Sequence, residues 1–338
     1  MPTVAIVSAG FMGSGLGAAL LAGGARVVTT LEGRSARSRR LAETAGLEIL
    51  PTLTDVVAVA DVILSITPPS AAVDAARSIA TAAEATHSRT TADGRRSRAA
   101  DEQPHQDSGQ AHADSERPRA HGGHSDADSE RPQAHSGLFR VGGGPVVADL
   151  NAVSPGTMGR AVRELGGLRV VDGSISGPPP SVKPGARVYL SGVEAEVVAG
   201  LPWAGMVEPV VLGDRVGAAS ALKMCTGSVY KGLVGLLTQA MRTAGAHGVL
   251  DEVLDDLARS GLADSEGVAR AATKAHRYVG EMREVSATQA EAGLSPDLFA
   301  AMAAVFADVA STRLADDDPE NDRALTPAEI VARLRSEA

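Results

Sequence analysis

The stretch that decides the fold of this chain is T-V-A-I-V-S-A-G-F-M-G-S-G, residues 3–15. Its first half is a short β-branched apolar run, typical of a strand buried in a parallel sheet. A glycine-rich turn follows, and the small apolar residues 16–21 predict a helix that packs flat on that sheet. A second strand is predicted over 25–30. Strand, turn, helix and strand make a βαβ unit, in which the unpaired amide N–H groups at the start of the helix face a phosphate.

The turn departs from the usual dinucleotide-binding pattern G-x-G-x-x-G, because Ser8 stands where the first glycine is expected. The order of strand, turn and helix nevertheless favours a nucleotide site over a turn that binds nothing. After the second strand, Arg34 and Ser35 supply a cation and a hydroxyl group for the 2′-phosphate of NADP. Glu32 is the nearby acid that would bind the 2′-hydroxyl of NAD instead. We therefore expect NADP as the cofactor, with NAD as the alternative.

The 338 residues are enough for two domains with a large core, and the formal net charge is -9. This acidic balance argues against a nucleic-acid partner, because no basic excess is present to neutralise phosphates. A single cysteine, Cys225, excludes an intrachain disulfide and favours a reducing compartment. No signal peptide or membrane-length apolar run is recognised. We therefore expect a cytoplasmic protein without a membrane partner.

Further strands are predicted at 48–50, 60–66, 145–150, 168–172, 187–191 and 207–212, and helices alone from 217 onward, at 218–244, 249–260, 264–292 and 297–313. The sequence thus predicts an α/β nucleotide-binding domain over 1–214 and an all-α domain over 215–338. Thr67, Pro68 and Pro69 directly follow the strand at 60–66. Prolines there end the strand and stiffen the loop at the carboxyl edge, where such sheets bind ligands.

The segment 86–138 differs in composition from its surroundings. It holds six of the eight histidines and many Ser, Asp and Arg residues, and A-D-S-E-R-P-R-A-H at 113–121 returns at 127–135 with one change. Such a segment cannot bury enough apolar surface to offset its ordering entropy, so we expect a disordered low-complexity insertion. Weak metal binding by its His and Asp residues is the less favoured interpretation, and no metal site is predicted.

Lys223 is the outstanding candidate for chemistry. It lies in A-A-S-A-L-K-M-C, an apolar helical stretch without another nearby charge. A desolvated ammonium group has a lowered pKa, which suits a general acid or base. Gly227 and Tyr230 are predicted to share its helix face, four and seven positions further on. The alternative is a lysine that extends to the helix surface.

Several motifs resemble those of the β-hydroxyacid dehydrogenases, the family of 3-hydroxyisobutyrate dehydrogenase, which is related to 6-phosphogluconate dehydrogenase. They are G-F-M-G at 10–13, T-P-P-S at 67–70, D-L-N-A-V-S-P at 149–155, I-S-G at 175–177, and Lys223. The resemblance implies a Rossmann-type domain followed by an all-α domain like the C-terminal domain of 6-phosphogluconate dehydrogenase. The segment R-Y-V-G-E-M at 277–282 is similar to a branch whose helical domain is poorly characterised.

The resemblance also implies roles for residues. Lys223 matches the catalytic lysine. The candidate cofactor-binding residues are Ser8, Gly10, Phe11, Met12, Gly13, Arg34, Ser35, Thr67, Pro68, Pro69 and Asn151. The candidate substrate-binding residues are Ser176, Gly177, Thr226, Gly227, Tyr230 and Arg277. Two departures from the family pattern concern the substrate: Gly227 replaces an asparagine, and prolines at 178–180 replace a glycine-rich stretch.

The function implied is that of an NADP-dependent oxidoreductase that moves a hydride between nicotinamide and a small hydroxy acid or oxo acid, with Lys223 as general acid and base. An imine reductase on the same architecture is one alternative, which Lys223 disfavours and Tyr230 supports. A nucleotide-binding sensor without turnover is the other. The long apolar helix at 218–244 suggests a homodimer formed through the helical domain.

Overall fold

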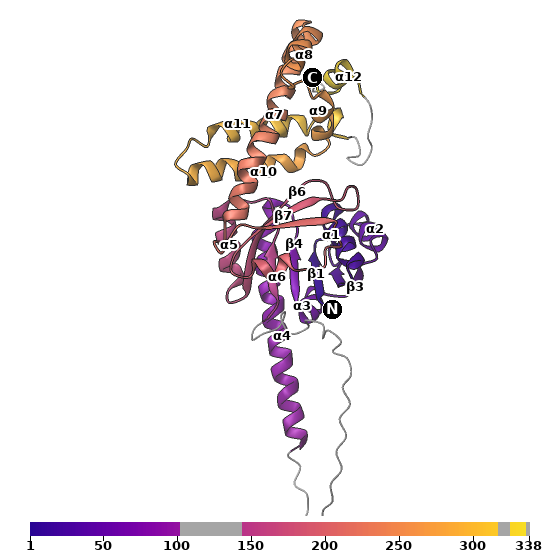
Figure 1. The fold of residues 1–338 in the computed structure, drawn as a ribbon, viewed down its shortest axis with the longest axis vertical. Coiled ribbons are helices and arrows are strands. Elements are labelled where there is room, and N and C mark those ends of the chain that lie inside the picture. The colour runs from indigo at the N-terminus through magenta and orange to yellow at the C-terminus, as the bar shows by residue number, and fades with distance from the viewer. Residues whose placement is uncertain (102–143, 317–324, 336–338) are drawn as a thin grey trace, which may run out of the picture.

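The computed structural model describes residues 1–101, 144–316 and 325–335. An α/β domain is followed by a helical domain, and one long helix, α7, runs from the sheet into the helical domain (Figure 1). In the described part of the chain, no helix combines the length and the apolar character that crossing a membrane requires.

The sheet has eight strands in the order β3-β2-β1-β4-β5-β6-β7-β8. They are β1 (Thr3–Val7), β2 (Arg26–Thr30), β3 (Glu48–Leu50), β4 (Val62–Ser65), β5 (Val146–Asp149), β6 (Arg169–Ser176), β7 (Ala186–Ser191) and β8 (Val207–Val211). The strands from β3 to β6 in this order are parallel, whereas β7 is antiparallel to β6 and parallel to β8. The strand order reverses between β1 and β4, and a doubly wound sheet binds its ligands at the carboxyl ends of such a pair.

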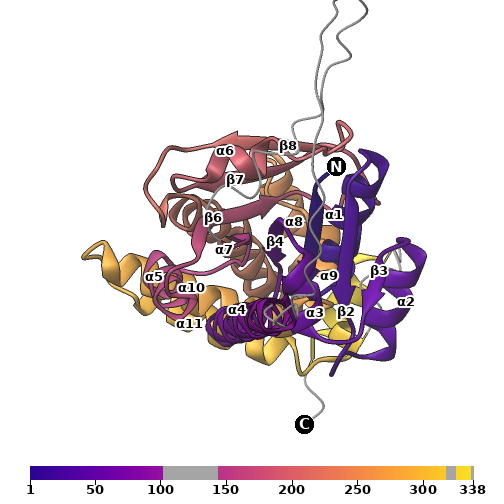
Figure 2. The same cartoon turned by 90° about the horizontal axis from the view of Figure 1, so that it is seen from below.

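The helices of the α/β domain are α1 (Phe11–Ala22), α2 (Ala36–Thr44), α3 (Leu53–Val59), the 3₁₀ turn η1 (Pro69–Ala71), α4 (Ala72–Asp101), α5 (Pro155–Leu165) and α6 (Ala195–Ala199). Those that follow are α7 (Ala218–His247), α8 (Leu250–Ala258), α9 (Ser265–Ala272), α10 (Ala275–Glu291), α11 (Asp297–Val309), the 3₁₀ turn η2 (Arg313–Asp316) and α12 (Pro327–Arg333). Helices α1 and α6 cover one face of the sheet, and α3, α4 and α5 cover the other (Figure 2).

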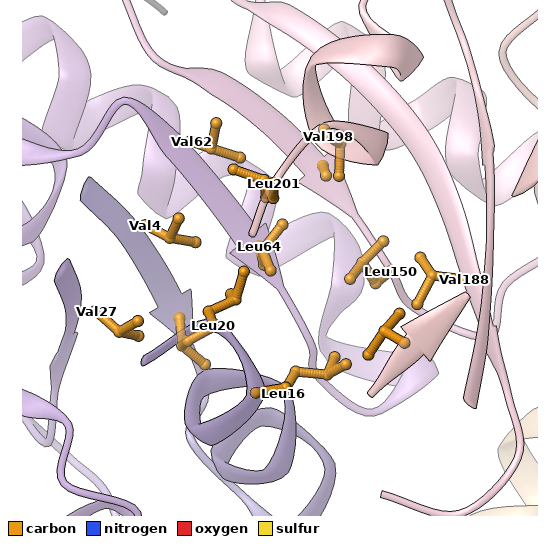
Figure 3. Close-up of a cluster of buried hydrophobic side chains, with 14 of the residues drawn as sticks. Val4, Leu16, Leu20, Val27, Val62, Leu64, Leu150, Val188, Val198 and Leu201 are labelled. Atoms are coloured by element: carbon orange, nitrogen blue, oxygen red, sulfur yellow. The ribbon is translucent and has the colours of Figure 1, made fainter. Parts of the chain in front are cut away.

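The core of the α/β domain explains why the first βαβ unit forms. Leu16 and Leu20 of α1 lie in one apolar cluster with Val4 of β1 and Leu64 of β4, and all four side chains are fully buried (Figure 3). Burying a side chain of this size contributes roughly 1.5–3 kcal/mol. The apolar runs that predicted the strand and the helix therefore supply the side chains that place α1 on the sheet.

Several predicted boundaries were wrong. The helix predicted over 16–21 begins at Phe11 as α1, within the residues that were predicted as the turn. The expected disordered insertion over 86–138 begins as helix, because α4 continues to Asp101; residues 102–138 lie outside the described residues. The strand predicted over 168–172 continues to Ser176 as β6, because its last residues pair with β7 from Asp172↔Ser191 to Ser176↔Arg187. This extension carries the end of β6 to the side of α7.

The helix predicted over 264–292 is divided into α9 and α10. Thr273 lies at the break, and its hydroxyl group donates to the Arg270 carbonyl at 3.1 Å. Such local bonding by threonine competes with the helical pattern. Helix α10 therefore starts afresh at Ala275, directly after Lys274.

Candidate active site

The turn between β1 and α1 keeps the shape of a nucleotide-binding turn despite Ser8. Ser8 adopts a φ of 74°, in the left-handed region that favours glycine. A Cβ atom at Gly13 would lie 2.5 Å from the Ser8 carbonyl oxygen, so only glycine permits this approach. Gly10 precedes α1 without a side-chain cap, and the first turn of α1 has no acidic residue. The first amide groups of α1 are thus available to a phosphate, which fits the pyrophosphate of a dinucleotide.

The candidate 2′-phosphate residues follow β2. Ser35 is the N-cap of α2, where its hydroxyl oxygen accepts from the Ser38 amide at 3.2 Å. Arg34 and Glu32 are both exposed beside it. Because the cation and the acid are equally accessible, the preference for NADP stays a prediction.

Asn151 links the carboxyl ends of the two central strands β4 and β5. The side-chain Oδ1 atom of Asn151 accepts from the backbone amide of Thr67 at 2.5 Å. The backbone amide of Asn151 donates to Oδ1 of Asp149 at 3.0 Å. Its Nδ2 atom is buried and has no hydrogen-bond partner in the described part of the chain. A ligand can supply the acceptor for this donor, and a nicotinamide nucleotide that extends from the α1 turn across this edge fits that position.

Asp149 itself lies beneath this contact and is buried. Burial, assisted by the charge of Asp172 on the adjacent strand, raises the pKa of Asp149 to about 7. The carboxyl end of β5 therefore holds a buried carboxyl group whose pKa lies near neutral pH.

Lys223 lies where β6 ends against α7. Its Nζ atom donates to the Ile175 carbonyl oxygen at 2.6 Å. Ser176 is the last residue of β6, and Gly177, which follows it, has a φ of 113°, which demands glycine. The structure thus brings Lys223 next to the turn expected to bind the substrate acid.

Asp172 determines where α7 begins, one turn before Lys223. Its carboxylate accepts from the Gly217 amide at 2.8 Å, and from the Ser220 amide and hydroxyl group at 3.1 and 2.6 Å. It also accepts from the hydroxyl group of Ser191 at 3.0 Å. A buried carboxylate at this helix N-terminus is favoured by the helix dipole, and it anchors α7 to the sheet.

The pKa of Lys223 is lowered to about 8. Burial is the main cause, the charges of Lys231 and Arg277 lower it further, and the carboxylate of Glu281 opposes them. A lysine with a pKa near 8 exists in both protonation states at physiological pH, as a general acid and base must.

Lys231 corrects the expectation that Lys223 has no charged neighbour. It lies two turns further along α7, pairs with the buried Glu281 of α10, and places its Nζ atom 5.0 Å from the centre of the Tyr278 ring. A Cβ atom at Gly227 would lie 3.8 Å from this Nζ atom. This is an ordinary van der Waals distance, so an alanine at this position would also leave the Lys231 ammonium group in place.

Sequence reasoning missed Lys231 and Glu281. The signal for Lys231 was its helical spacing of eight from Lys223, with a glycine midway between them. Glu281 gave no signal of this kind, because its partner is 50 residues away in the chain.

Two candidate substrate residues lie away from this site. Thr226 is exposed and its hydroxyl group donates to the Leu222 carbonyl of its own helix, whereas Tyr230 is 70% exposed. Tyr230 belongs to an exposed apolar face of α7 together with Val229, Leu233 and Leu236. The helical spacing predicted that Tyr230 shares a face with Lys223, but the sheet covers only the start of α7. Tyr230 lies further along the helix and stays exposed.

Two family models match parts of the chain. Residues 3–88 match the model described as NADP oxidoreductase, coenzyme F420-dependent, and residues 244–309 match a domain of unknown function, DUF1932. No curated protein matches the chain.

Solved structures match over nearly the whole length. The 3-hydroxyisobutyrate dehydrogenase of Mycobacterium tuberculosis is 15% identical with a TM-score of 0.61, covering 99% of this chain and 100% of that one. The Salmonella typhimurium enzyme is 14% identical with a TM-score of 0.59, covering 98% and 99%. A conserved protein of unknown function, described as similar in structure to 3-hydroxyacid dehydrogenases, is 23% identical with a TM-score of 0.57, covering 91% and 96%.

At these identities the likeness concerns the fold, and it confirms the predicted fold class and, at that level, the resemblance to the β-hydroxyacid dehydrogenases. The chain therefore combines a segment that matches the NADP oxidoreductase model with a segment that matches DUF1932, on the fold of the 3-hydroxyacid dehydrogenases.

Proposed function

We propose that this protein is an NADP-dependent oxidoreductase that acts on a small hydroxy acid or oxo acid, with Lys223 as the general acid and base. The observation that carries the proposal is the position of Lys223. Its ammonium group, with a lowered pKa, lies beside Ile175 and the Ser176–Gly177 turn, where the helical domain meets the carboxyl edge of the sheet.

The residues that would hold the cofactor belong to three loops at that edge. The turn from Gly10 to Gly13 would bind the pyrophosphate, and Asn151 with Thr67 would bind the nicotinamide half. When bound, the nicotinamide supplies or accepts the hydride.

Lys223 would move the proton that accompanies the hydride. In the oxidation direction, its neutral amine accepts the hydroxyl proton of the substrate; in the reduction direction, its ammonium form returns that proton to the carbonyl oxygen. Ser176 and Gly177 would hold the carboxylate of the substrate, so that the reacting carbon of the substrate lies next to the Nζ atom of Lys223.

The two alternatives have less support. An imine reductase needs a proton donor beside the reacting bond, and Tyr230, the tyrosine that kept this interpretation open, is 70% exposed. A nucleotide-binding sensor has no need of a buried lysine with a pKa near 8.

The test is NADPH consumption, measured by absorbance, with a panel of 2- and 3-oxo acids, oxo-phosphonates and cyclic imines. We expect turnover of an oxo acid, and Lys223→Met should lower it strongly while NADPH still binds. NADPH binding with no consumption across the panel would favour the sensor. Turnover of imines alone would favour the imine reductase.

A further inference from the structure

Residues 177–183, between β6 and β7, hold three consecutive prolines and lie against α1; we call them the proline strap. A Cβ atom at Gly15 of α1 would come within 2.9 Å of Cβ of Pro179 and 3.0 Å of Oγ of Ser181. Gly15 is buried, and so are Pro179 and Pro180. The strap therefore packs on α1 at the one position where the helix offers bare backbone to it.

The proline strap is stiff. The amides of Val182 and Lys183 both donate to the carbonyl oxygen of Pro179, at 2.9 and 3.1 Å. Each proline ring also fixes one backbone dihedral angle, so few conformations are open to the segment. A displacement at Pro179 is therefore passed on to the ends of the strap and is not absorbed within it.

The first end of the strap belongs to the candidate site. Gly177 directly follows Ser176, the last residue of β6, and the carbonyl oxygen of the preceding Ile175 accepts from Nζ of Lys223. Ile175 also shares an apolar cluster with Leu16 of α1. The turn expected to hold the substrate acid is thus supported from α1 as well as from β6.

The contact on α1 lies next to the cofactor turn. Gly15 follows two residues after Gly13, whose close approach to Ser8 shapes the turn expected to hold the pyrophosphate. The prolines at 178–180 have no N–H group, so this part of the strap cannot donate to an anion. What the strap can do is fix the distance between the cofactor turn and the substrate turn.

We propose that Gly15 is a positioning residue for the substrate: because it has no side chain, the proline strap closes onto α1 and fixes the Ser176–Gly177 turn relative to the cofactor turn. This inference rests on the proposed function for the presence of the substrate acid at that turn. Carbon atoms in ordinary contact lie ~3.5–4.0 Å apart, so a methyl group at residue 15 must displace the Pro179 ring by about 0.6 Å or more. The Cβ atom of Pro179 is bonded directly to the backbone, so no side-chain rotation can absorb this displacement.

The first test is Gly15→Ala, assayed with the oxo acid that the protein reduces. We expect kcat/KM to fall by on the order of tenfold, mainly through KM, because a misplacement of ~1 Å can cost about 10²-fold. The affinity for NADPH and the inflection in the pH profile expected from Lys223 should persist, since the added methyl group faces the strap. A general loss of folding would instead change all of these together.

Gly17→Ala is the matched control. Gly17 is buried on the same helix, and its Cβ atom would lie 2.7 Å from Cδ2 of Leu47, the end of a side chain that can turn aside. Both substitutions raise the helix propensity by the same amount, and of the two glycines only Gly15 has the strap as its nearest neighbour. We expect kcat/KM to be unaltered in Gly17→Ala. An equal loss in both variants would overturn the positioning role, because crowding of α1 would then explain it.

Pro178→Gly is a second variant that adds no clash. Pro178 is exposed and joins Gly177 to the docked part of the strap. Its replacement loosens this connection, so KM for the acid should rise while NADPH still binds. An unchanged KM in both Pro178→Gly and Gly15→Ala would reject the positioning role.

Hydrogen exchange tests the docking of the strap without turnover. The amides of Val182 and Lys183 should be protected in the wild type and in Gly17→Ala, and should exchange faster in Gly15→Ala. Equal protection in all three proteins would overturn the docking on Gly15, even where oxo acids are reduced.

Binding of propionate in the presence of NADP separates this inference from the proposed reaction. Propionate should raise the Tm of the wild type and of Gly17→Ala, and should raise that of Gly15→Ala less. An equal rise in all three proteins contradicts the positioning role, and no rise in the wild type contradicts the acid site itself. A rise that is lost in Gly15→Ala, in a protein that consumes no NADPH with any acid, would support the positioning role and reject the proposed reaction.

Discussion

Replacement of Lys223 is the sharpest perturbation that the structure suggests. Burial lowers its pKa from 10.5 to about 8. At pH 7 the neutral amine is then about one molecule in ten, whereas an unperturbed lysine would be neutral in about one in three thousand. Burial therefore raises the population of the base form by about 300-fold.

The assay is a pH series of the steady-state rate in both directions. With wild-type protein, kcat/KM for oxidation should rise with pH up to about 8 and then level off, while kcat/KM for reduction should fall above about 8. Lys223→Met should lower turnover by ~10²–10⁴-fold and remove this inflection. Lys223→Arg should restore little, because a guanidinium group keeps its proton.

A melting experiment distinguishes lost chemistry from lost folding. Because the folded pKa of Lys223 lies below the unfolded value, its charged form destabilises the fold, fully below about pH 8 and no longer above 10.5. The Tm of Lys223→Met relative to wild type should be highest near pH 7 and decline across that window. Near-normal turnover by Lys223→Met, or an inflection that persists in it, would refute the role assigned to Lys223.

Four further predictions concern the rest of the chain. Gly13→Ala should weaken NADPH binding by on the order of tenfold or more in a fluorescence titration, because its Cβ would lie 2.5 Å from the Ser8 carbonyl oxygen; unchanged affinity would show that the turn does not hold the cofactor. Arg34→Ala should raise the KM for NADPH far more than that for NADH, and equal effects would remove its assignment to the 2′-phosphate. We expect a homodimer formed through the exposed apolar face of α7, so Leu233→Glu should yield a monomer in sedimentation, and a wild-type monomer would contradict this expectation. Asp149→Asn should raise the Tm more at pH 8 than at pH 4.5. The folded protein raises the pKa of Asp149 to about 7, so ionisation of this carboxyl group costs stability increasingly between pH 3.8 and 7. An equal change in Tm at both pH values would show that Asp149 is ionised without a cost in stability.

Features whose physical cause is local were predictable from the sequence. The run from Thr3 to Val7 predicted β1, which forms there, and the helix predicted after it also forms, although α1 begins at Phe11 and not at residue 16. Ser154 caps α5 with Pro155 at its first position, as its sequence pattern indicates. All the groups involved lie within a few residues of each other, so no distant contact is needed to decide the outcome.

The errors arose where local composition and long-range pairing disagree. Low apolar content predicted disorder from residue 86, yet α4 continues to Asp101, because helical hydrogen bonds are made within the segment and need no buried face. The last residues of β6, up to Ser176, read as a turn because of Gly173 and Ser174, and only pairing with β7 extends the strand through them. Strand pairing is a contact between distant segments, which a reading along the chain does not contain.

The sequence by itself determined the nucleotide-binding unit, the division into strands and then helices, and Lys223 as the candidate for proton transfer. These follow from periodicity, glycine placement and a charge on an apolar helix. The tertiary structure alone decided the surroundings of that lysine. Asp172 anchors α7 from 48 residues away, and the Lys231–Glu281 pair and Arg277 reach the cleft because α10 crosses α7. Electrostatic interactions depend on distance in space and on burial, and neither is written in the spacing of residues along a chain.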